Sequence, residues 1–159
     1  MARLKTLREY VNQQLQSMSD LDKRQSAFVH LYGVSLAAAL IAEKRKLNTE
    51  LACLAAMLHD LHAYLSGSYE DHARLGAELA KTILDELQLT SPEETDMICS
   101  AIHRHDDKDR VDGDLDEVLK DADVMHHTFN DLAKAVKDKE KARYLALRQE
   151  FGLPPVNLE

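Results

Sequence analysis

Histidine and aspartate side chains are concentrated in the middle of this sequence, in stretches where helices are expected. All eight histidines lie between His30 and His127, and the segments on either side contain none. Three separate stretches offer an imidazole or a carboxylate: those with His30, with the pair His59-Asp60 and with Asp123. These donors suit divalent ions such as Mn, Fe, Co, Ni or Mg better than they suit a thiolate zinc site. The pattern therefore predicts a site for one or two divalent metal ions.

The pair His59-Asp60 ends the most apolar stretch of the chain. Eight apolar residues in a row, from Leu51 to Leu58, indicate a helix that is buried nearly all round. A carboxylate in a dry interior costs roughly several kcal/mol unless a cation or a set of hydrogen bonds offsets its desolvation. The pair is therefore expected to face a metal ion.

The elements that must position these residues are helices. Apolar residues recur at spacings of three and four, and Ser91-Pro92 with Glu94 forms a helix-start signature. The segments 62–70 and 106–116 are predicted to be loops. The predicted helices run from Arg3 to Met18, from about Leu21 to Lys46, from Asn48 to Leu61, from near Asp71 to Leu87, from Ser91 to about His105, from Leu115 to Phe129 and from Asp131 to Phe151.

The composition supports an all-α fold. Only 5 Gly and 3 Pro occur in 159 residues, so the turn formers that a many-stranded fold needs are scarce. The length fits one domain over residues 1–159. We expect a helical bundle of about six to seven helices, with the metal-site core at about 27–129 and terminal helices at 1–18 and 131–151.

The charge, the cysteine residues and the N-terminal segment argue against several other classes of protein. The formal net charge of −8 argues against a general nucleic-acid binder, which needs a basic face. Cys53 and Cys99 lie in apolar helical runs and are expected to be buried thiols in a reducing cytosol. The charged N-terminus lacks the apolar core of a signal peptide, and no uninterrupted apolar run reaches about 18 residues. We expect a soluble, cytoplasmic protein that does not bind membranes.

The order His, then His-Asp, then Asp resembles the HD (His-Asp) domain superfamily of metal-dependent phosphohydrolases. The resemblance covers roughly Ala27 to Phe129 and is to a small, single-domain, bacterial-type member. It implies an all-helical fold in which the metal ligands are His30, His59, Asp60 and Asp123. It also implies that Asp60 can bridge two ions if two are present.

Two further segments resemble the branch of this superfamily that has extra histidines and a possible dinuclear centre. They are His72-Ala-Arg-Leu-Gly-Ala and Ala101-Ile-His-Arg-His105. In that branch the second pattern places the ligand at His105, although His103 remains an alternative. Asp121 likewise remains an alternative to Asp123, because residues two apart on a helix face different directions and only one can point inward.

The resemblance implies hydrolysis of a phosphate ester or anhydride in a small phosphorylated molecule, and the expected substrate is a nucleotide. A metal-activated hydroxide would attack phosphorus in line, with His59 and Asp60 as the catalytic pair. Arg104, Lys108 and Arg74 are the predicted substrate-phosphate contacts. Further candidates are Arg110, Lys23 and Arg24.

The chain departs from the family pattern in ways that bear on its substrate. Asp106-Asp107 follows His105 where relatives that cleave dinucleoside polyphosphates have Thr-Gly, which disfavours that substrate. Val124-Met125 follows Asp123 where Arg-Leu is common, and Leu61-His62 follows the His-Asp pair where small or branched residues are usual. Two alternative functions are a catalytically silent sensor that binds metal and nucleotide, and a diiron oxygenase of the same fold.

The remaining polar residues of these stretches are expected to play supporting roles. His62, His103, His126 and His127 are predicted to support the ligands or face solvent, and His127 lies one helical turn after Asp123, within hydrogen-bonding reach. Tyr64 and Tyr69 are expected either to line the mouth of the pocket or to pack. The basic residues between Lys134 and Arg143 alternate with acids, which is typical of a solvated helix face.

Overall fold

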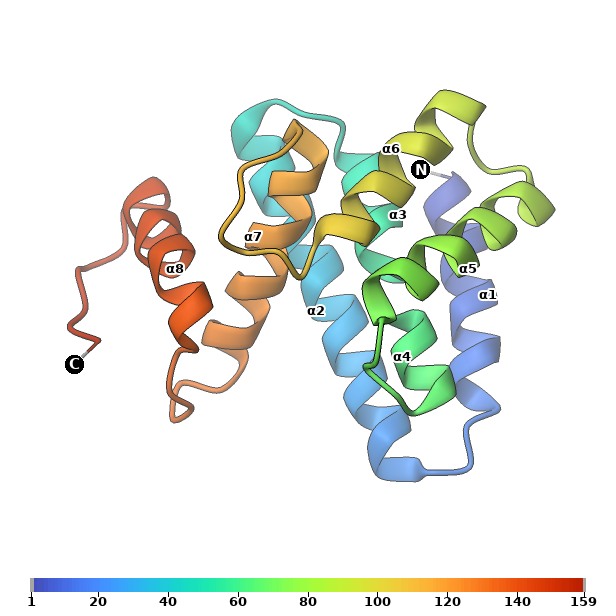
Figure 1. Ribbon diagram of the computed structural model, residues 1–159, viewed down its shortest axis with the longest axis horizontal. Helices are drawn as coiled ribbons and strands as arrows, with labels where there is room; N and C mark the ends of the chain where they lie inside the picture. Colours follow the sequence, from blue (N-terminus) through green and yellow to red (C-terminus); the bar gives the residue numbers. More distant parts are fainter. Residues whose placement is uncertain (1, 159) are drawn as a thin grey trace.

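The computed structural model describes residues 2–158, and all regular structure in this range is helical (Figure 1). The prediction of an all-α fold is confirmed. The helices are α1 (Ala2–Gln16), α2 (Leu21–Arg45), α3 (Thr49–Leu58), α4 (Leu61–Ser66), α5 (His72–Leu87), α6 (Pro92–Arg104), α7 (Asp114–Asn130) and α8 (Asp138–Glu150).

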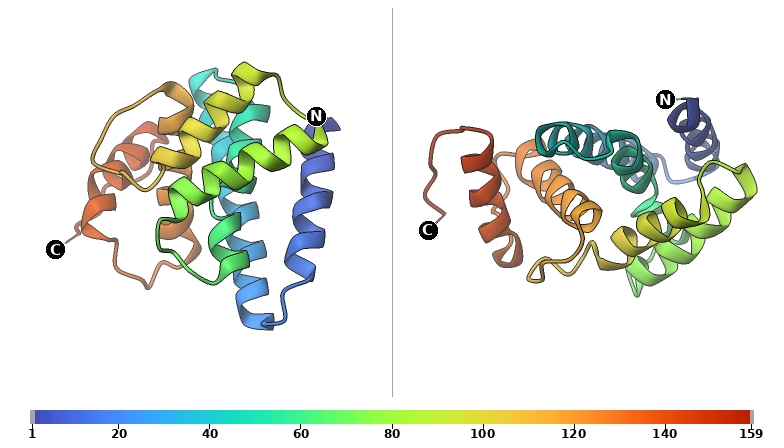
Figure 2. Two further views of the ribbon diagram at one scale, coloured as in Figure 1. Left: turned by 45° about the vertical axis from the view of Figure 1, so that its right-hand side comes forward. Right: turned by 90° about the horizontal axis from the view of Figure 1, so that it is seen from above.

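Helix α3 lies at the centre of the fold. Its residues from Leu51 to Leu58 are all buried, as the unbroken apolar run predicts. Helices α1, α2, α6 and α7 all pack against it, while α8 packs against α7 at the end of the molecule opposite α1 (Figure 2). The His-Asp pair at the end of α3 is thus delivered into the middle of the bundle.

Side-chain caps fix where the core helices begin. The Asp20 carboxylate accepts a hydrogen bond from the Lys23 backbone N–H, and the Asn48 side chain accepts one from Leu51. Ser91 and Glu94 form the reciprocal capping box that the sequence predicts. These caps set the starting points of α2, α3 and α6, and therefore the register in which each helix presents its polar side chains.

Two predicted boundaries are wrong. The sequence predicts a loop at 62–70, but Leu61–Ser66 forms α4, because Leu61 and Ala63 are buried and tertiary packing stabilises a helix too short to signal itself. The predicted last helix starts too early, since α8 begins at Asp138 and residues 131–137 are not helical. That helix is polar on most sides, so no apolar stripe marks its start.

Helix α2 is long and apolar enough to cross a membrane by length and composition alone, with a mean hydropathy of 1.4 in its most apolar window. Half of that window is buried inside this fold, where α2 packs against α3 and α7. A core helix of a folded bundle meets the same two criteria. Here the buried side of α2 also carries His30.

A buried lysine holds the loop between α6 and α7. Lys120 of α7 is fully buried, and its Nζ donates to the Arg110 carbonyl at 2.8 Å and to Asp112 Oδ2 at 2.6 Å. Glu117 Oε1 lies 3.2 Å from the same ammonium group. This one side chain therefore ties the end of the loop to the helix that follows it.

Replacing Lys120 by methionine is expected to lower the free energy of unfolding by about 2–3 kcal/mol, because the hydrogen bonds to Asp112 and a carbonyl and the ion pair with Glu117 are lost together. Urea denaturation followed by circular dichroism measures this. The matched control is Lys81→Met, which removes the exposed pair with Asp85 at 3.2 Å and should cost about 0.5 kcal/mol or less. Equal effects of the two substitutions would contradict the anchoring role of Lys120.

Candidate metal centre

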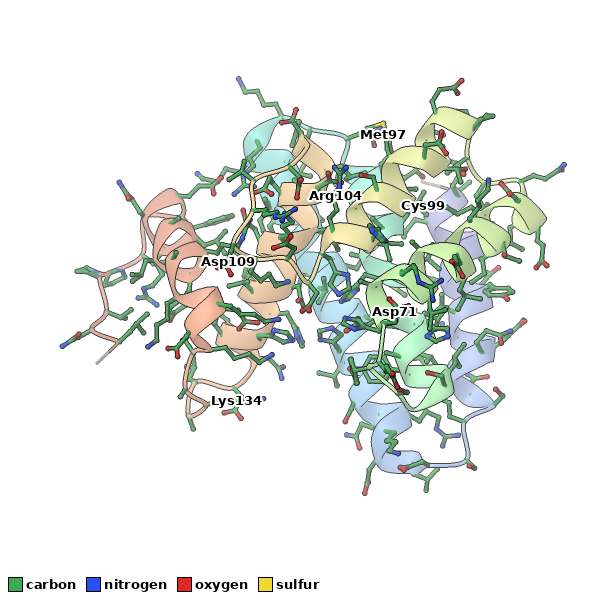
Figure 3. The ribbon with its side chains drawn as sticks, viewed as in Figure 1. Asp71, Met97, Cys99, Arg104, Asp109 and Lys134 are labelled. Carbon is green, nitrogen blue, oxygen red and sulfur yellow. The ribbon has the colours of Figure 1, made fainter. Side chains whose placement is uncertain are left out.

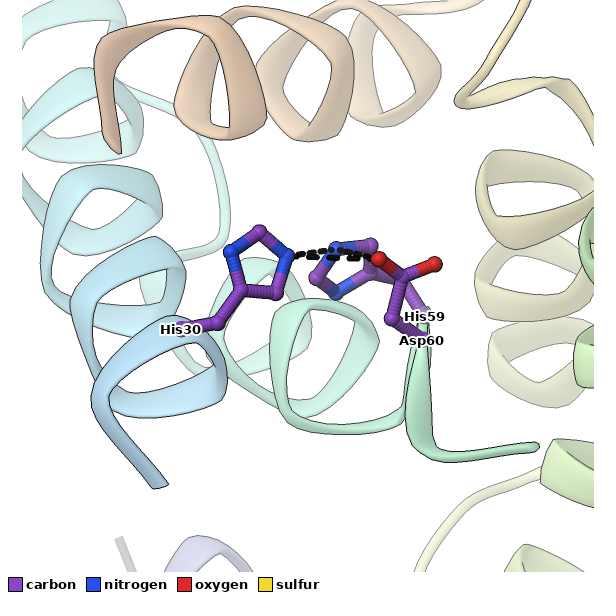
Figure 4. Close-up of side chains that lie close together, drawn as sticks. All are labelled: His30, His59 and Asp60. Carbon is purple, nitrogen blue, oxygen red and sulfur yellow. Dashed lines mark hydrogen bonds and ion pairs between the residues drawn. The ribbon is translucent and has the colours of Figure 1, made fainter. Parts of the chain in front are cut away.

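Three helices bring two imidazoles and two carboxylates together around one point. His30 Nε2, from α2, lies 3.3 Å from Asp60 Oδ2 and 3.6 Å from Asp123 Oδ1 of α7. His59 Nε2 lies 3.5 Å and 3.8 Å from the same two oxygens. All four side chains are buried, and Figure 4 shows the His30 ring directed at the His59-Asp60 pair. The four residues that the sequence predicts to meet are therefore adjacent in space.

Two more imidazoles approach Asp60 from its other side. His72 Nε2, at the start of α5, and His105 Nε2, just after α6, lie 3.7 Å and 3.4 Å from Asp60 Oδ1. Each carboxylate oxygen of Asp60 thus faces a different pair of histidines. Gly76 allows α5 to pass this close to α3, because a Cβ at that position would lie 2.9 Å from the His59 carbonyl oxygen.

Backbone carbonyls fix how three of these imidazoles are oriented. The Nδ1 atoms of His59, His72 and His105 lie 2.8, 2.9 and 2.6 Å from the carbonyl oxygens of residues 56, 69 and 102. A carbonyl can only accept, so each Nδ1 carries a proton and Nε2 is the ring nitrogen that faces Asp60. A cation, either a proton or a metal ion, must lie between each Nε2 and the carboxylate, because facing lone pairs repel each other.

Protons alone do not supply that cation. His30 Nε2 and His59 Nε2 are 3.1 Å apart, so only one of them can carry a proton directed at the other. Asp60 Oδ1 and Asp123 Oδ1 are both buried without a hydrogen-bond partner among the described residues. Nitrogen lone pairs and unpaired carboxylate oxygens at one point are the donor set of a borderline or hard divalent ion. The residues present therefore fit such a metal.

Both carboxylates are held in their ionised, metal-binding form. Burial by itself would raise the pKa of Asp60, but the neighbouring imidazoles of His59, His105 and His30 outweigh it and hold the pKa well below its usual range. Burial would likewise raise the pKa of Asp123, but the Lys108 ammonium and adjacent imidazoles hold it well below its usual range.

Asp123, rather than Asp121, reaches the cluster. Asp121 points to the other side of α7, where it pairs with Arg45 at 2.7 Å and with Arg143 at 2.9 Å. Lys108 holds Asp123 in place, since its buried Nζ donates to Asp123 Oδ2 at 2.6 Å and to the His105 carbonyl at 2.7 Å. Of the two aspartates that the sequence leaves open as ligands, Asp123 is therefore the one that lies at the cluster.

Comparison with known proteins agrees with this arrangement. The family model of the HD domain matches residues 27–128, which include His30, the His-Asp pair and Asp123. The chain belongs to the HD domain family. The match is nearly coincident with the stretch from Ala27 to Phe129 that carries the sequence resemblance.

One solved structure is similar to this HD domain over most of its length. It is the crystal structure of a predicted HD superfamily hydrolase from an uncultured Thermotogales bacterium, with a TM-score of 0.57 and 24% sequence identity. The alignment covers 95% of this chain and 87% of that chain, so the two share a fold. No curated protein matches the chain.

The predicted phosphate contacts are separated by the structure. Lys108 lies beside the cluster, where its Nζ donates to Asp123 and to the His105 carbonyl and so holds Asp123 in place. Arg74 pairs with Asp71 and Glu78 on the surface of α5. Arg104, which is labelled on α6 in Figure 3, donates to Asp116 Oδ2 at 3.0 Å and is not among the residues around Asp60. The two arginines line a separate groove between α5 and α6 that also contains His103.

The other basic candidates also lie elsewhere. Arg110 is exposed and pairs with Asp107 at 3.2 Å. Lys23 lies 3.7 Å from Asp20, and Arg24 donates to the Gln16 carbonyl at 3.2 Å. None of these three basic side chains lies among the residues around Asp60.

A cavity of about 200 Å³ opens onto the cluster. Besides the His and Asp residues, its walls include Tyr64, Tyr69, Asp106, His127 and Lys137. The tyrosines therefore line the pocket, one of the two roles the sequence leaves open for them. The walls also include Lys137, which the sequence predicts to face solvent, and His127, which it predicts to support the ligands or face solvent. For His127, the four-residue spacing from Asp123 already indicates that its side chain lies near that carboxylate.

Behind His30 lies a second histidine that sets its orientation. His30 Nδ1 and His126 Nδ1 are 3.1 Å apart, and burial, followed by the neighbouring imidazoles, lowers the pKa of His126 to about 4. A neutral His126 can accept the His30 proton at Nδ1, which leaves the His30 Nε2 lone pair for the cluster. Gly33 makes room for this ring, since a Cβ there would overlap His126 Cδ2.

Gly33→Ala is therefore expected to displace the His126 ring and to weaken metal binding by about 10-fold or more, because an outer partner of a metal-binding imidazole is lost. Helix content should be retained, since alanine favours a helix over glycine. Metal titration and circular dichroism measure the two quantities. An unchanged affinity in the folded variant would show that His126 does not orient His30.

Proposed function

We propose that this HD domain is a metal-dependent phosphohydrolase that cleaves a phosphate ester or anhydride of a nucleotide-like small molecule. The observation that carries the proposal is the meeting of ionised Asp60 and Asp123 with inward-facing imidazoles at the floor of one cavity. The proposed ligands are His30, His59, Asp60 and Asp123, with His72 and His105 forming a second group on Asp60. When bound, a divalent ion supplies Lewis acidity that acidifies water and polarises phosphoryl oxygens.

The chain's own residues would bind and orient the phosphate. Lys137 places a cation in the cavity wall, and Tyr64 and Tyr69 contribute hydroxyl groups. Burial raises the pKa of both tyrosines, so each keeps its proton and can donate a hydrogen bond to a phosphoryl oxygen. Their rings contact each other edge to face, with centroids 6.3 Å apart, which restricts both side chains.

A larger groove supports a substrate with a bulky group beyond the phosphate. Its volume is about 530 Å³, and it shares His30, Tyr64 and His127 with the cavity wall. This volume lies in the range of small-molecule sites. The groove also offers polar side chains of Gln25, Ser26 and Asn130 and the apolar side chain of Val29. This mixture suits the sugar and base of a nucleotide.

A phosphate-release screen tests the proposal. Protein purified without added metal would be analysed for its ions and then assayed over nucleotides and sugar phosphates with Mn, Co, Ni, Mg and, without oxygen, Fe. We expect release that requires metal, and His103→Gln should behave like the wild type because this side chain is exposed and outside the cluster.

Two other outcomes would overturn the assignment to hydrolysis. Tight binding of metal and nucleotide without release of phosphate would favour a sensor of the same fold. Oxygen consumption by an iron-loaded protein, without phosphate release, would favour a diiron oxygenase, in which Asp60, with two imidazoles near each oxygen, would hold both ions.

A further inference from the structure

His127 shares the geometry of the imidazoles at the cluster, although neither the sequence pattern nor the family resemblance assigns it there. It lies one turn after Asp123 on α7, and its Nε2 is 3.3 Å from Asp123 Oδ1. Its ring stacks on that of His30, with centroids 5.3 Å apart and planes inclined by 20°. It also forms part of the cavity wall. His127 therefore presents a ring nitrogen to the same unpaired carboxylate oxygen as His30 and His59.

A buried glutamate fixes the orientation of this ring. His127 Nδ1 lies 3.0 Å from Glu140 Oε1 of α8, and Glu140 is only 1% exposed. A carboxylate accepts the Nδ1 proton, so Nε2 is the ring nitrogen that faces Asp123 and is free to bind a metal ion. Carbonyl oxygens play the same part for His59, His72 and His105. A buried carboxylate is costly unless it is paired, and its partners here are His127 and, at 3.6 Å, Lys137.

We propose that His127 is a further metal ligand, held in place by Glu140, that completes a donor group with His30 and Asp123. One donor atom from each of these three residues lies within 4.8 Å of the others. Asp123 Oδ1, the oxygen nearest to His127 Nε2, is buried and has no hydrogen-bond partner among the described residues. The inference rests on the proposed metal centre and extends it by one ligand and one positioning residue.

The proposal gives α8 a part in the centre. The family match ends at residue 128, so Glu140 and Lys137 come from a segment beyond it. Glu140 is a positioning residue that acts through His127. Changes in how α8 packs on α7 would then alter metal affinity, even though α8 itself supplies no ligand.

Cobalt titration of the full chain tests this assignment. The variants are His127→Gln, Glu140→Gln and the control His103→Gln, each checked by circular dichroism. Visible absorption reports the cobalt coordination, and total bound metal is measured by mass spectrometry. We expect His127→Gln to weaken cobalt affinity by about 10–100-fold and to change the absorption spectrum. Glu140→Gln should change the cobalt affinity and the absorption spectrum in the same direction but less, because its amide oxygen still accepts from His127 Nδ1. The control His103→Gln should match the wild type in both quantities.

A folded His127→Gln variant with wild-type affinity and spectrum would overturn the proposal. If phosphate release fell in that variant without a change in cobalt binding, His127 would contact substrate instead, and the ligand assignment would again be wrong. Either result leaves the proposed hydrolase standing, because wild-type metal binding and turnover are measured separately. Failure of the wild type to bind any divalent ion would instead remove the proposed function.

Discussion

Replacing Asp60 by asparagine is expected to abolish tight metal binding and to lower phosphate release by about 10³-fold or more. The two oxygens of this side chain face two different pairs of imidazoles, at 3.3 and 3.5 Å on one side and 3.7 and 3.4 Å on the other. An amide keeps one oxygen, loses the charge and turns N–H donors toward nitrogen lone pairs. The two pairs of imidazoles therefore lose the carboxylate that they share, although the side chain keeps nearly the same shape.

The same substitution should leave the metal-free protein as stable as the wild type, or more stable. The asparagine N–H groups can donate to Nε2 atoms that face an unpaired carboxylate oxygen in the wild type. Thermal melting in chelator measures this. Asp106→Asn is the control, because Asp106 lines the cavity but pairs with Lys139 at 2.7 Å. The metal affinity of this variant should stay close to that of the wild type. A destabilised Asp60→Asn protein that still binds metal would contradict the account.

Removing the metal should destabilise the wild-type protein strongly. A ligand present at about 1,000 times its dissociation constant stabilises the folded state by about 4 kcal/mol. For a domain of this size that corresponds to a fall in melting temperature of roughly 8–16 °C when a chelator is added. Phosphate release should disappear in parallel and return when metal is restored.

Calorimetry with and without chelator, before and after metal is restored, measures this effect. The Asp60→Asn protein provides the control, since its melting temperature should not respond to the chelator. If the wild-type protein melted at the same temperature with and without its ion, the side chains of the cluster at Asp60 would not bind a common metal ion.

The parts of the fold that sequence could predict are those with an apolar signature. Helix α3 is marked by its unbroken apolar run, and the caps Asn48 and Ser91 lie where expected. Helix α4 gives no such signal, because it follows α3 with a break only at Asp60, where the backbone leaves helical geometry at φ −110° and ψ 7°. The contact between His127 and Glu140 was also hidden, because α8 has no apolar stripe to indicate which side faces α7.

Helical geometry alone could have shown that Arg74 and Arg104 do not contact a phosphate at the cluster. Successive residues of an α-helix point about 100° apart, since a turn contains 3.6 residues. If His105 faces the cluster, Arg104 beside it must point elsewhere, and Arg74, two residues after His72, faces nearly the opposite side of α5. The spacing that identifies the ligands thus also rules out these neighbours, whereas Lys137 belongs to a non-helical segment whose path no periodicity predicts.

Anomalous diffraction from crystals of the manganese-loaded protein tests the central claim most directly. We expect a peak between His30, His59, Asp60 and Asp123, within bonding distance of all four side chains. Protein that has bound manganese in solution but shows no peak there, or a peak only in the groove lined by Arg74 and His103, would contradict it.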